Sequence, residues 1–267
     1  RQTVYQNFGF NKFMYLGSKY PIKHQSSIDR SAYLSDETAY ANTIDEILDA
    51  QGSKFINLVT MQNHLPYDSN YYNGKEKYAA SGNAVTHDYV RGMVEEYVMG
   101  LHYTDEAVKN FIEKIDSINK PITFVFYGDH LPGIYWDTNN NNILHQTDYF
   151  IYSNKYARRH LGRRIYKQYD LVAPTDFMSL VQKQTLTKTT PYSALLEKVL
   201  DELPVITTKA AAGSKEESDA AMINDNGELI KYDDLSSSQK ELYNDYKLVQ
   251  YDMTAGNNYL ENMNFTR

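Results

Sequence analysis

A carboxylate and an imidazole stand side by side directly after an apolar stretch of the chain. The run 122–127 is short, β-branched and aromatic, and Gly128 separates it from Asp129 and His130. Such a run is typical of a strand covered by helices on both faces, and in these sheets ligands bind beyond the carboxyl ends of the strands. Asp offers a hard oxygen ligand and neutral His a nitrogen ligand, so the pair suits zinc or manganese. The alternative is a turn Asp that caps a helix beside a half-exposed His.

A second strand-like run also ends in polar residues. The run 54–61 is mostly apolar, and Gln62, Asn63 and His64 follow it. His64 is therefore a second imidazole at the expected end of a strand. Among the other histidines, we expect a surface position for His24, His87 and His160 and a structural role on a helix for His102. His145 lies either in the cleft or outside it. Trp136 either forms a wall of the pocket or belongs to the core.

Composition limits the class of protein. The chain has 267 residues, of which 42% are hydrophobic, enough for one large α/β domain or one domain with a small appendage. A net charge of −7 argues against a nucleic acid partner. Cysteine is absent, which excludes thiolate metal sites and disulfides. No apolar run approaches the roughly 20 residues that span a bilayer, so we expect a soluble chain and any membrane anchor outside this sequence.

Strand-like and helical runs alternate along the chain. We expect strands at 12–16, 54–61, 122–127 and 147–153, and helices at 37–50, 93–117, 174–184 and 191–203. Asp36 is the expected N-cap of the first of these helices. This order predicts an α/β fold with a mainly parallel central sheet and helices on both faces.

The C-terminal part has a different pattern. Residues 207–219 read as a linker, Asn226-Gly227 within 220–234 predicts a hairpin, and 236–260 has helical spacing. We therefore expect a catalytic domain at 1–206 and a hairpin-plus-helix subdomain at 207–267. The run 158–164 holds four arginines, which form either a solvated basic face or a patch facing an anionic polymer or membrane.

Five strings along the chain together resemble one family. They are Arg1-x-x-Val4-Tyr5-x-x-Phe8-Gly9, Val59-Thr60-Met61-Gln62-Asn63-His64-Leu65-Pro66-Tyr67, His102-Tyr103-Thr104-Asp105, Phe126-Tyr127-Gly128-Asp129-His130-Leu131-Pro132-Gly133, and Asp245-Tyr246-x-x-Val249-Gln250-Tyr251-Asp252. The chain resembles the extracellular catalytic domain of lipoteichoic acid synthases, which are sulfatase-like phosphoglycerol transferases of the alkaline phosphatase superfamily. The resemblance covers nearly the whole chain.

The resemblance implies a sulfatase-like α/β fold and a metal-dependent transferase. Such an enzyme takes glycerophosphate from phosphatidylglycerol onto a threonine and passes it to a growing polyglycerolphosphate glycolipid, lipoteichoic acid. It implies a divalent cation, Mn²⁺ with Mg²⁺ or Zn²⁺ as alternatives, held in part by Asp129 and His130. It also implies that His64 contacts the substrate and that Arg1 contacts its phosphate.

One part of the family pattern has no counterpart in this chain. The nucleophilic threonine and the metal-binding glutamate of the family precede the position of Arg1, so no catalytic nucleophile is assigned. We expect the C-terminal part of a catalytic domain that is inactive alone, either truncated or complemented by the N-terminal part as a separate chain.

The resemblance also implies a place of action and leaves alternatives open. The family works at the extracellular face of the Gram-positive cell membrane, where such a chain is anchored through a segment outside this sequence or released as a soluble fragment. The alternative activities are a sulfatase or phosphodiesterase on the same scaffold, and a non-catalytic fragment that binds glycerophosphate.

Overall fold

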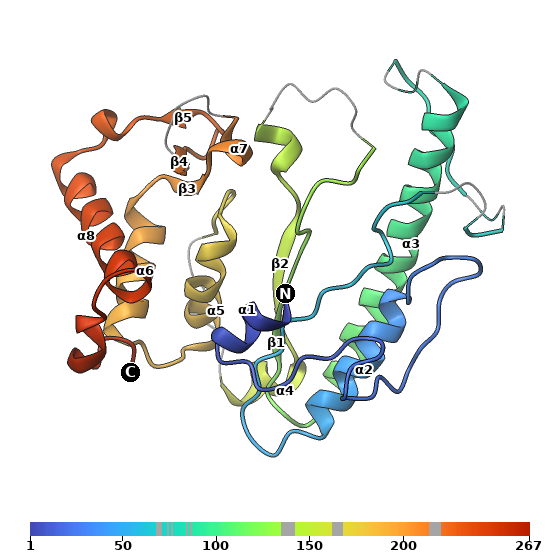
Figure 1. Ribbon diagram of the computed structural model, residues 1–267, viewed down its shortest axis with the longest axis horizontal. Helices are drawn as coiled ribbons and strands as arrows, with labels where there is room; N and C mark the ends of the chain where they lie inside the picture. Colours follow the sequence, from blue (N-terminus) through green and yellow to red (C-terminus); the bar gives the residue numbers. More distant parts are fainter. Residues whose placement is uncertain are drawn as a thin grey trace. The chain divides into compact units, whose positions relative to one another are not determined.

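The computed structural model (Figure 1) describes most of the chain in two compact units. It describes residues 1–67, 71–73, 75, 77–83, 85, 87–134, 142–161, 168–213 and 220–267. One unit comprises Arg1–Ile118 with Pro132–Trp136, and the other comprises Asn119–Leu131 with Asp137–Arg267. Among the described helices, none is both long and apolar enough to cross a membrane.

Three helices form the first unit, namely α1 (Gln2–Asn7), α2 (Asp36–Leu48) and α3 (Asp88–Asp116). The predicted helix at 37–50 is present, but its cap differs from the expectation. Ser35 is the N-cap, and its hydroxyl accepts from the Thr38 N–H at 3.2 Å. Asp36 is the first helical residue and is only 1% exposed, because its side chain turns inward to accept from the Thr104 hydroxyl.

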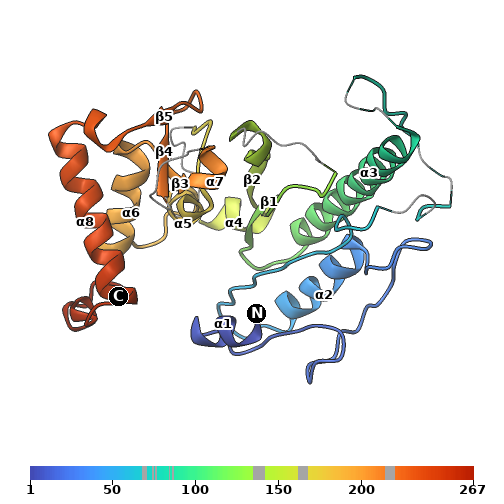
Figure 2. The same ribbon diagram turned by 45° about the horizontal axis from the view of Figure 1, so that its top comes forward.

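The two long helices of this unit pack side by side, as Figures 1 and 2 both show. Helix α3 is amphipathic, and its buried residues recur at intervals of three and four; they are Met93, Glu96, Met99, Gly100, Thr104, Ala107, Phe111 and Ile115. The ring of Tyr40 in α2 packs against the ring of Phe111 in α3, with centroids 4.9 Å apart and planes tilted by 30°. This apolar contact fixes α2 beside α3, while polar side chains join the same helices further along.

Two predicted strands of the first unit are not formed. Residues 12–16 and 54–61 have no strand pairing, although 54–60 run without a helix or turn. Phe55 is 73% exposed, and Leu58 and Val59 are also exposed. A strand exists only where a neighbouring strand pairs with its backbone, and among the described residues no strand pairs with either segment.

The second unit contains the remaining elements. They are β1 (Thr123–Tyr127), η1 (Asn142–His145), β2 (Tyr149–Ser153), α4 (Lys155–His160), η2 (Pro174–Asp176), α5 (Phe177–Thr185), α6 (Pro191–Glu202), β3 (Val205–Thr208), α7 (Lys209–Ala212), β4 (Ala220–Ile223), β5 (Leu229–Ile230), η3 (Tyr232–Asp234), α8 (Ser237–Thr254) and η4 (Tyr259–Met263). The helices and strands predicted between 122 and 203 are all present, with ends shifted by one to three residues; the first turn of the helix predicted at 174–184 is the 3-10 helix η2.

Strand pairing in the second unit is antiparallel wherever it is described. β1 pairs with β2 in the register Val125 to Ile151, and the rings of Phe126 and Phe150 stack at 5.1 Å. The side chains of β1 are half-buried, with Tyr127 exposed, and are not covered on both faces as expected. The α/β class is confirmed, whereas the described residues form no parallel pair, because the candidate parallel neighbours at 12–16 and 54–61 remain unpaired.

The predicted C-terminal hairpin and helix are present and pack onto the elements before them. β4 and β5 form the hairpin, with Gly227 at φ 76° in its turn, where glycine carries no steric penalty. β3 extends this sheet through β4, and part of the expected linker at 207–219 therefore lies in β3 and α7. Leu242 and Tyr246 of α8 pack against Val199 of α6. The boundary between 206 and 207 stays a prediction, and both the sheet and the core continue across it.

Candidate functional site

Asp129 and His130 lie together just beyond the end of β1. Gly128 lets the backbone pass close to Thr147, because a Cβ at this position would lie 2.9 Å from the Thr147 hydroxyl oxygen. The Oδ1 atom of Asp129 is 3.8 Å from Nε2 of His130, and both side chains are more than half exposed. The Nδ1–H of His130 donates to the carbonyl oxygen of Leu131 at 2.8 Å. A neutral His130 in this tautomer carries its lone pair on Nε2, the nitrogen that faces Asp129.

This pair fits part of a divalent cation site. Oxygen and nitrogen donors about 2.1 Å from one ion lie roughly 3 to 3.5 Å apart, so a small side-chain adjustment would bring the observed pair onto one ion. Backbone support of the other ring nitrogen is the usual arrangement for a metal-binding histidine. Within the described residues, however, no group of three or more His, Asp or Glu side chains gathers in this way. The pair supplies two ligands, and further ligands are needed.

His64 lies in the loop after 54–61 and is half-buried. Its Nδ1–H donates to the carbonyl oxygen of Leu65 at 3.0 Å, the same local arrangement that His130 makes with Leu131. Both histidines precede Leu-Pro in the sequence. The rings of His64 and Tyr33 also make an edge-to-face contact, with centroids 5.9 Å apart and planes at 74°.

A buried polar network supports the His64 loop from behind. The Gln62 side chain accepts from the Asp36 N–H at 2.9 Å and donates to the Gly100 carbonyl at 3.0 Å. The Asn63 amide donates to the Thr104 hydroxyl at 2.8 Å. That hydroxyl donates in turn to the Asp36 carboxylate at 2.6 Å. The loop residues directly before His64 are thus bonded to both α2 and α3.

The buried carboxyl group of Asp36 holds its proton more tightly than an exposed aspartate does. Burial raises the pKa of Asp36 above its ordinary value, and hydrogen bonds from Thr104 and Thr60 partly oppose this rise. Sequence reasoning missed this role, because Asp36 has the position of a solvent-facing helix cap. Its partner Thr104 lies 68 positions further along the chain, and no local pattern could have paired them.

The loop segment after His130 contacts the loop segment after His64 inside the first unit. A Cβ at Gly133 would lie only 2.2 Å from Cδ1 of Leu65, so glycine permits this close approach. The Tyr67 hydroxyl donates to the Asn63 carbonyl at 2.8 Å. Burial, the largest cause, raises the pKa of Tyr67 to about 12, and this phenol remains a neutral hydrogen-bond donor at physiological pH.

Arg1 is exposed at the N-cap position of α1. The Asn57 amide donates to the Tyr5 hydroxyl at 2.8 Å and so joins α1 to the 54–61 segment that precedes His64. Arg1 and His64 belong to the first unit, whereas Asp129 and His130 belong to the second. The role predicted for each of the four residues stays a prediction.

The other candidates have mostly structural contacts. His24 and His160 are exposed; His24 lies 3.3 Å from Asp45, and His160 stacks on Tyr156. His102 contacts the Tyr78 hydroxyl at 3.2 Å, which fits the structural role expected of it. His145 is exposed in η1, and His87 is exposed at the start of α3. Trp136, Arg163 and Arg164 lie outside the described residues.

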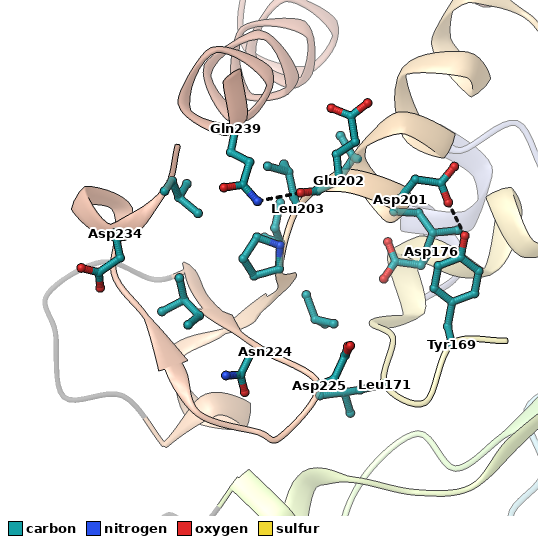
Figure 3. Close-up of a pocket in the computed structure, with 17 residues that line it drawn as sticks. Tyr169, Leu171, Asp176, Asp201, Glu202, Leu203, Asn224, Asp225, Asp234 and Gln239 are labelled. Carbon is teal, nitrogen blue, oxygen red and sulfur yellow. Dashed lines mark hydrogen bonds between the residues drawn. The ribbon is translucent and has the colours of Figure 1, made fainter. Parts of the chain in front are cut away.

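The second unit contains a pocket of about 390 Å³ with an acidic lining (Figure 3). Five of the residues that line it are acidic, namely Asp176, Asp201, Glu202, Asp225 and Asp234. Among the described residues that line it, none is basic. Asp201 accepts from Tyr169 and from Lys183, and Asp176 accepts from the Ala173 N–H. Because five carboxylates together would repel an anionic phosphate, we do not assign the pocket to glycerophosphate.

Comparisons with known proteins agree with the fold and the motifs. The profile of the Sulfatase family matches residues 1–181. The structure of the Streptococcus pyogenes phosphoglycerol transferase GacH in complex with sn-glycerol-1-phosphate is 34% identical, with a TM-score of 0.73, and the match covers 99% of this chain and 60% of that one.

Two curated relatives are more distant in sequence. A Rhizobium meliloti protein named for cyclic β-1,2-glucan modification is 22% identical over 97% of this chain and 39% of its own length. Lipoteichoic acid synthase 1 of Bacillus subtilis is 26% identical over 49% of this chain and 19% of its own length. This chain thus spans less than two thirds of each of these proteins. The family match extends over most of the chain, and the chain belongs to the sulfatase family.

Proposed function

We propose that this chain forms part of a metal-dependent transferase that moves glycerophosphate from phosphatidylglycerol to a polymeric acceptor. The similarity to a phosphoglycerol transferase over nearly the whole chain, at 34% identity, is the observation that carries this proposal. The resemblance to lipoteichoic acid synthases suggests polyglycerolphosphate as the acceptor. We also propose that the reaction takes place at the outer face of a Gram-positive bacterial membrane, the face on which lipoteichoic acid is built.

Four residues of this chain have distinct roles in the proposed site. Asp129 and His130 would hold a divalent cation, Mn²⁺ in our proposal, which neutralises phosphate charge and lowers the pKa of a bound hydroxyl. Arg1 would offer a planar pair of N–H donors to the non-bridging phosphate oxygens. His64 would donate from Nε2 to a phosphate oxygen or protonate the leaving alkoxide.

The proposed covalent step needs a threonine outside this chain. In our proposal its hydroxyl oxygen attacks phosphorus, the bond from phosphorus to the diacylglycerol oxygen breaks, and the leaving alkoxide takes a proton. The acceptor hydroxyl then displaces the threonine by the same exchange. The polypeptide that supplies this threonine and the further glutamate ligand is the partner we propose for this chain.

Binding of glycerol phosphate to the purified chain tests this function. Calorimetry with sn-glycerol-1-phosphate in the presence of Mn²⁺ should detect binding to the wild type. His64→Gln should weaken it by about tenfold, the usual effect of losing a hydrogen bond to a charged group. The matched control is His160→Gln, because His160 is an exposed histidine stacked on Tyr156, and its loss should leave the affinity unchanged.

The same titration separates the alternatives. Absence of binding by the wild type, or an equal loss in both variants, would contradict the proposal. An aryl sulfate that binds more tightly than glycerol phosphate would favour a sulfatase on this scaffold.

A further inference from the structure

Tyr33 contacts the His64 imidazole from a loop that is distant in sequence. Its hydroxyl donates to the carbonyl oxygen of Leu65 and lies 3.4 Å from Nδ1 of His64. The His64 Nδ1 atom is itself 3.0 Å from the same carbonyl oxygen. Three polar atoms, from Tyr33, His64 and Leu65, therefore meet at one point behind the imidazole.

This meeting point determines which ring nitrogen carries the proton. A carbonyl oxygen can only accept, so Nδ1 must bear the hydrogen that it donates to Leu65. The Tyr33 hydroxyl donates its hydrogen to the same carbonyl oxygen. Toward the Nδ1–H of His64, 3.4 Å away, the hydroxyl oxygen can therefore act only as an acceptor. Both neighbours of Nδ1 are then acceptors, and the neutral imidazole carries its lone pair on Nε2.

Both partners are held by anchored backbone. Tyr33 lies two residues before Ser35, the N-cap of α2, and His64 lies two residues after Gln62. Gln62 is 4% exposed, and its side chain accepts from the Asp36 N–H at 2.9 Å. The two segments are therefore joined by a buried hydrogen bond close to the Tyr33–His64 contact, which limits how far either ring can move.

We infer that Tyr33 is a positioning residue for His64. Its hydroxyl oxygen is a second acceptor for Nδ1–H beside the Leu65 carbonyl, which strengthens the preference for the Nδ1–H tautomer. Tyr33 also fixes the plane of the imidazole so that Nε2 is directed to the phosphate of the substrate. This inference rests on the proposed function for the role of Nε2, whereas the effect of Tyr33 on the tautomer stands on the geometry alone. Tyr33 acts through His64 and is not itself placed on the substrate.

Substitution Tyr33→Phe tests the inference, because it keeps the ring and removes only the hydroxyl. The imidazole nitrogens of the full chain are followed by ¹⁵N NMR, with His64 assigned from the spectrum of His64→Gln. We expect wild-type His64 to be the Nδ1–H tautomer and Tyr33→Phe to contain a larger fraction of the Nε2–H tautomer, because the Leu65 carbonyl is then the remaining acceptor of the two. Affinity for sn-glycerol-1-phosphate should fall roughly fivefold, as for one lost neutral hydrogen bond.

Tyr78→Phe is the matched control, because the Tyr78 hydroxyl contacts Nδ1 of another histidine, His102, at 3.2 Å. It should change the His102 signals and leave those of His64 unchanged. An unchanged His64 tautomer in Tyr33→Phe would overturn the inference. A wild-type chain that binds no glycerol phosphate would overturn the proposed function instead, and the tautomer measured without ligand would still decide the role of Tyr33.

Discussion

At the scale of single residues, the positions that determine the candidate site are paired over long distances in the sequence. The adjacency of Asp129 and His130 could be predicted, because the two residues are consecutive and follow an apolar run. The contacts of His64 with Tyr33, and of Asp36 with Thr104, join positions that are 31 and 68 residues apart. A side-chain network of this kind has no period and no local motif, so only the folded structure reveals it.

The buried Asp36 carboxyl makes a prediction about pH. Because burial raises its pKa, the folded chain keeps a proton here over a pH range in which the unfolded chain has released it. The stability that this group contributes is therefore greatest below the ordinary carboxyl pKa of about 3.9 and falls as the pH rises toward the raised value. Asp36→Asn should remove this fall, which urea unfolding between about pH 4 and pH 7 would measure.

The control for this prediction is Asp225→Asn, at an exposed position in the hairpin turn. Its unfolding free energy should follow the wild type at every pH. If the difference between wild type and Asp36→Asn is constant over this range, Asp36 does not titrate differently in the folded and unfolded chain.

At the scale of elements, helices were easier to predict than strands. The signals for α3 and α6 lie within or next to each segment: the apolar periodicity of α3, and the N-cap Thr190 with Pro191 at the start of α6. Both helices are present, although α3 begins at Asp88, five residues before the predicted start. The run 54–61 has the composition of a strand, yet it stays unpaired, because strand formation depends on a neighbour elsewhere in the chain. The hairpin of β4 and β5 is the exception that supports this explanation, since its partner strands are joined by one short turn.

Helix α3 supports the His64 loop through one glycine. A Cβ at Gly100 would lie 2.4 Å from Oδ1 of Asn63 and 2.9 Å from the Tyr72 hydroxyl, and Tyr72 is only 2% exposed. Alanine normally stabilises a helix relative to glycine by about 0.5–1 kcal/mol. Here the clash should outweigh this gain, and Gly100→Ala should lower the free energy of unfolding by about 1–3 kcal/mol.

Gly92, in the same helix α3, provides the control for Gly100→Ala. A Cβ at Gly92 would have no other atom within 4 Å, so Gly92→Ala should be stabilising by about 0.5–1 kcal/mol. Chemical denaturation measures both variants. Equal effects of the two substitutions would show that Asn63 and Tyr72 move aside at little cost.

At the scale of the whole molecule, the class of fold and the family could be predicted from the sequence. The sequence suggested a boundary near 206, where the composition changes. The contacts of the structure group into two units that separate at Ile118 and Asn119, and the boundary near 206 stays a prediction. Composition reports how polar a segment is, whereas a unit is defined by which segments pack together, as α6 and α8 do around Val199 and Leu242.

The most direct test of the account is the metal affinity of the Asp129–His130 pair. Calorimetric titration of the chain with Mn²⁺ should show binding by the wild type. Asp129→Ala should lose at least tenfold in affinity, while Asp170→Ala, at an exposed aspartate of the same unit outside the acidic pocket, should bind as the wild type does. Mn²⁺ affinity that is the same in wild type and Asp129→Ala would contradict the assignment of this pair as the metal-binding part of a phosphoglycerol transferase site.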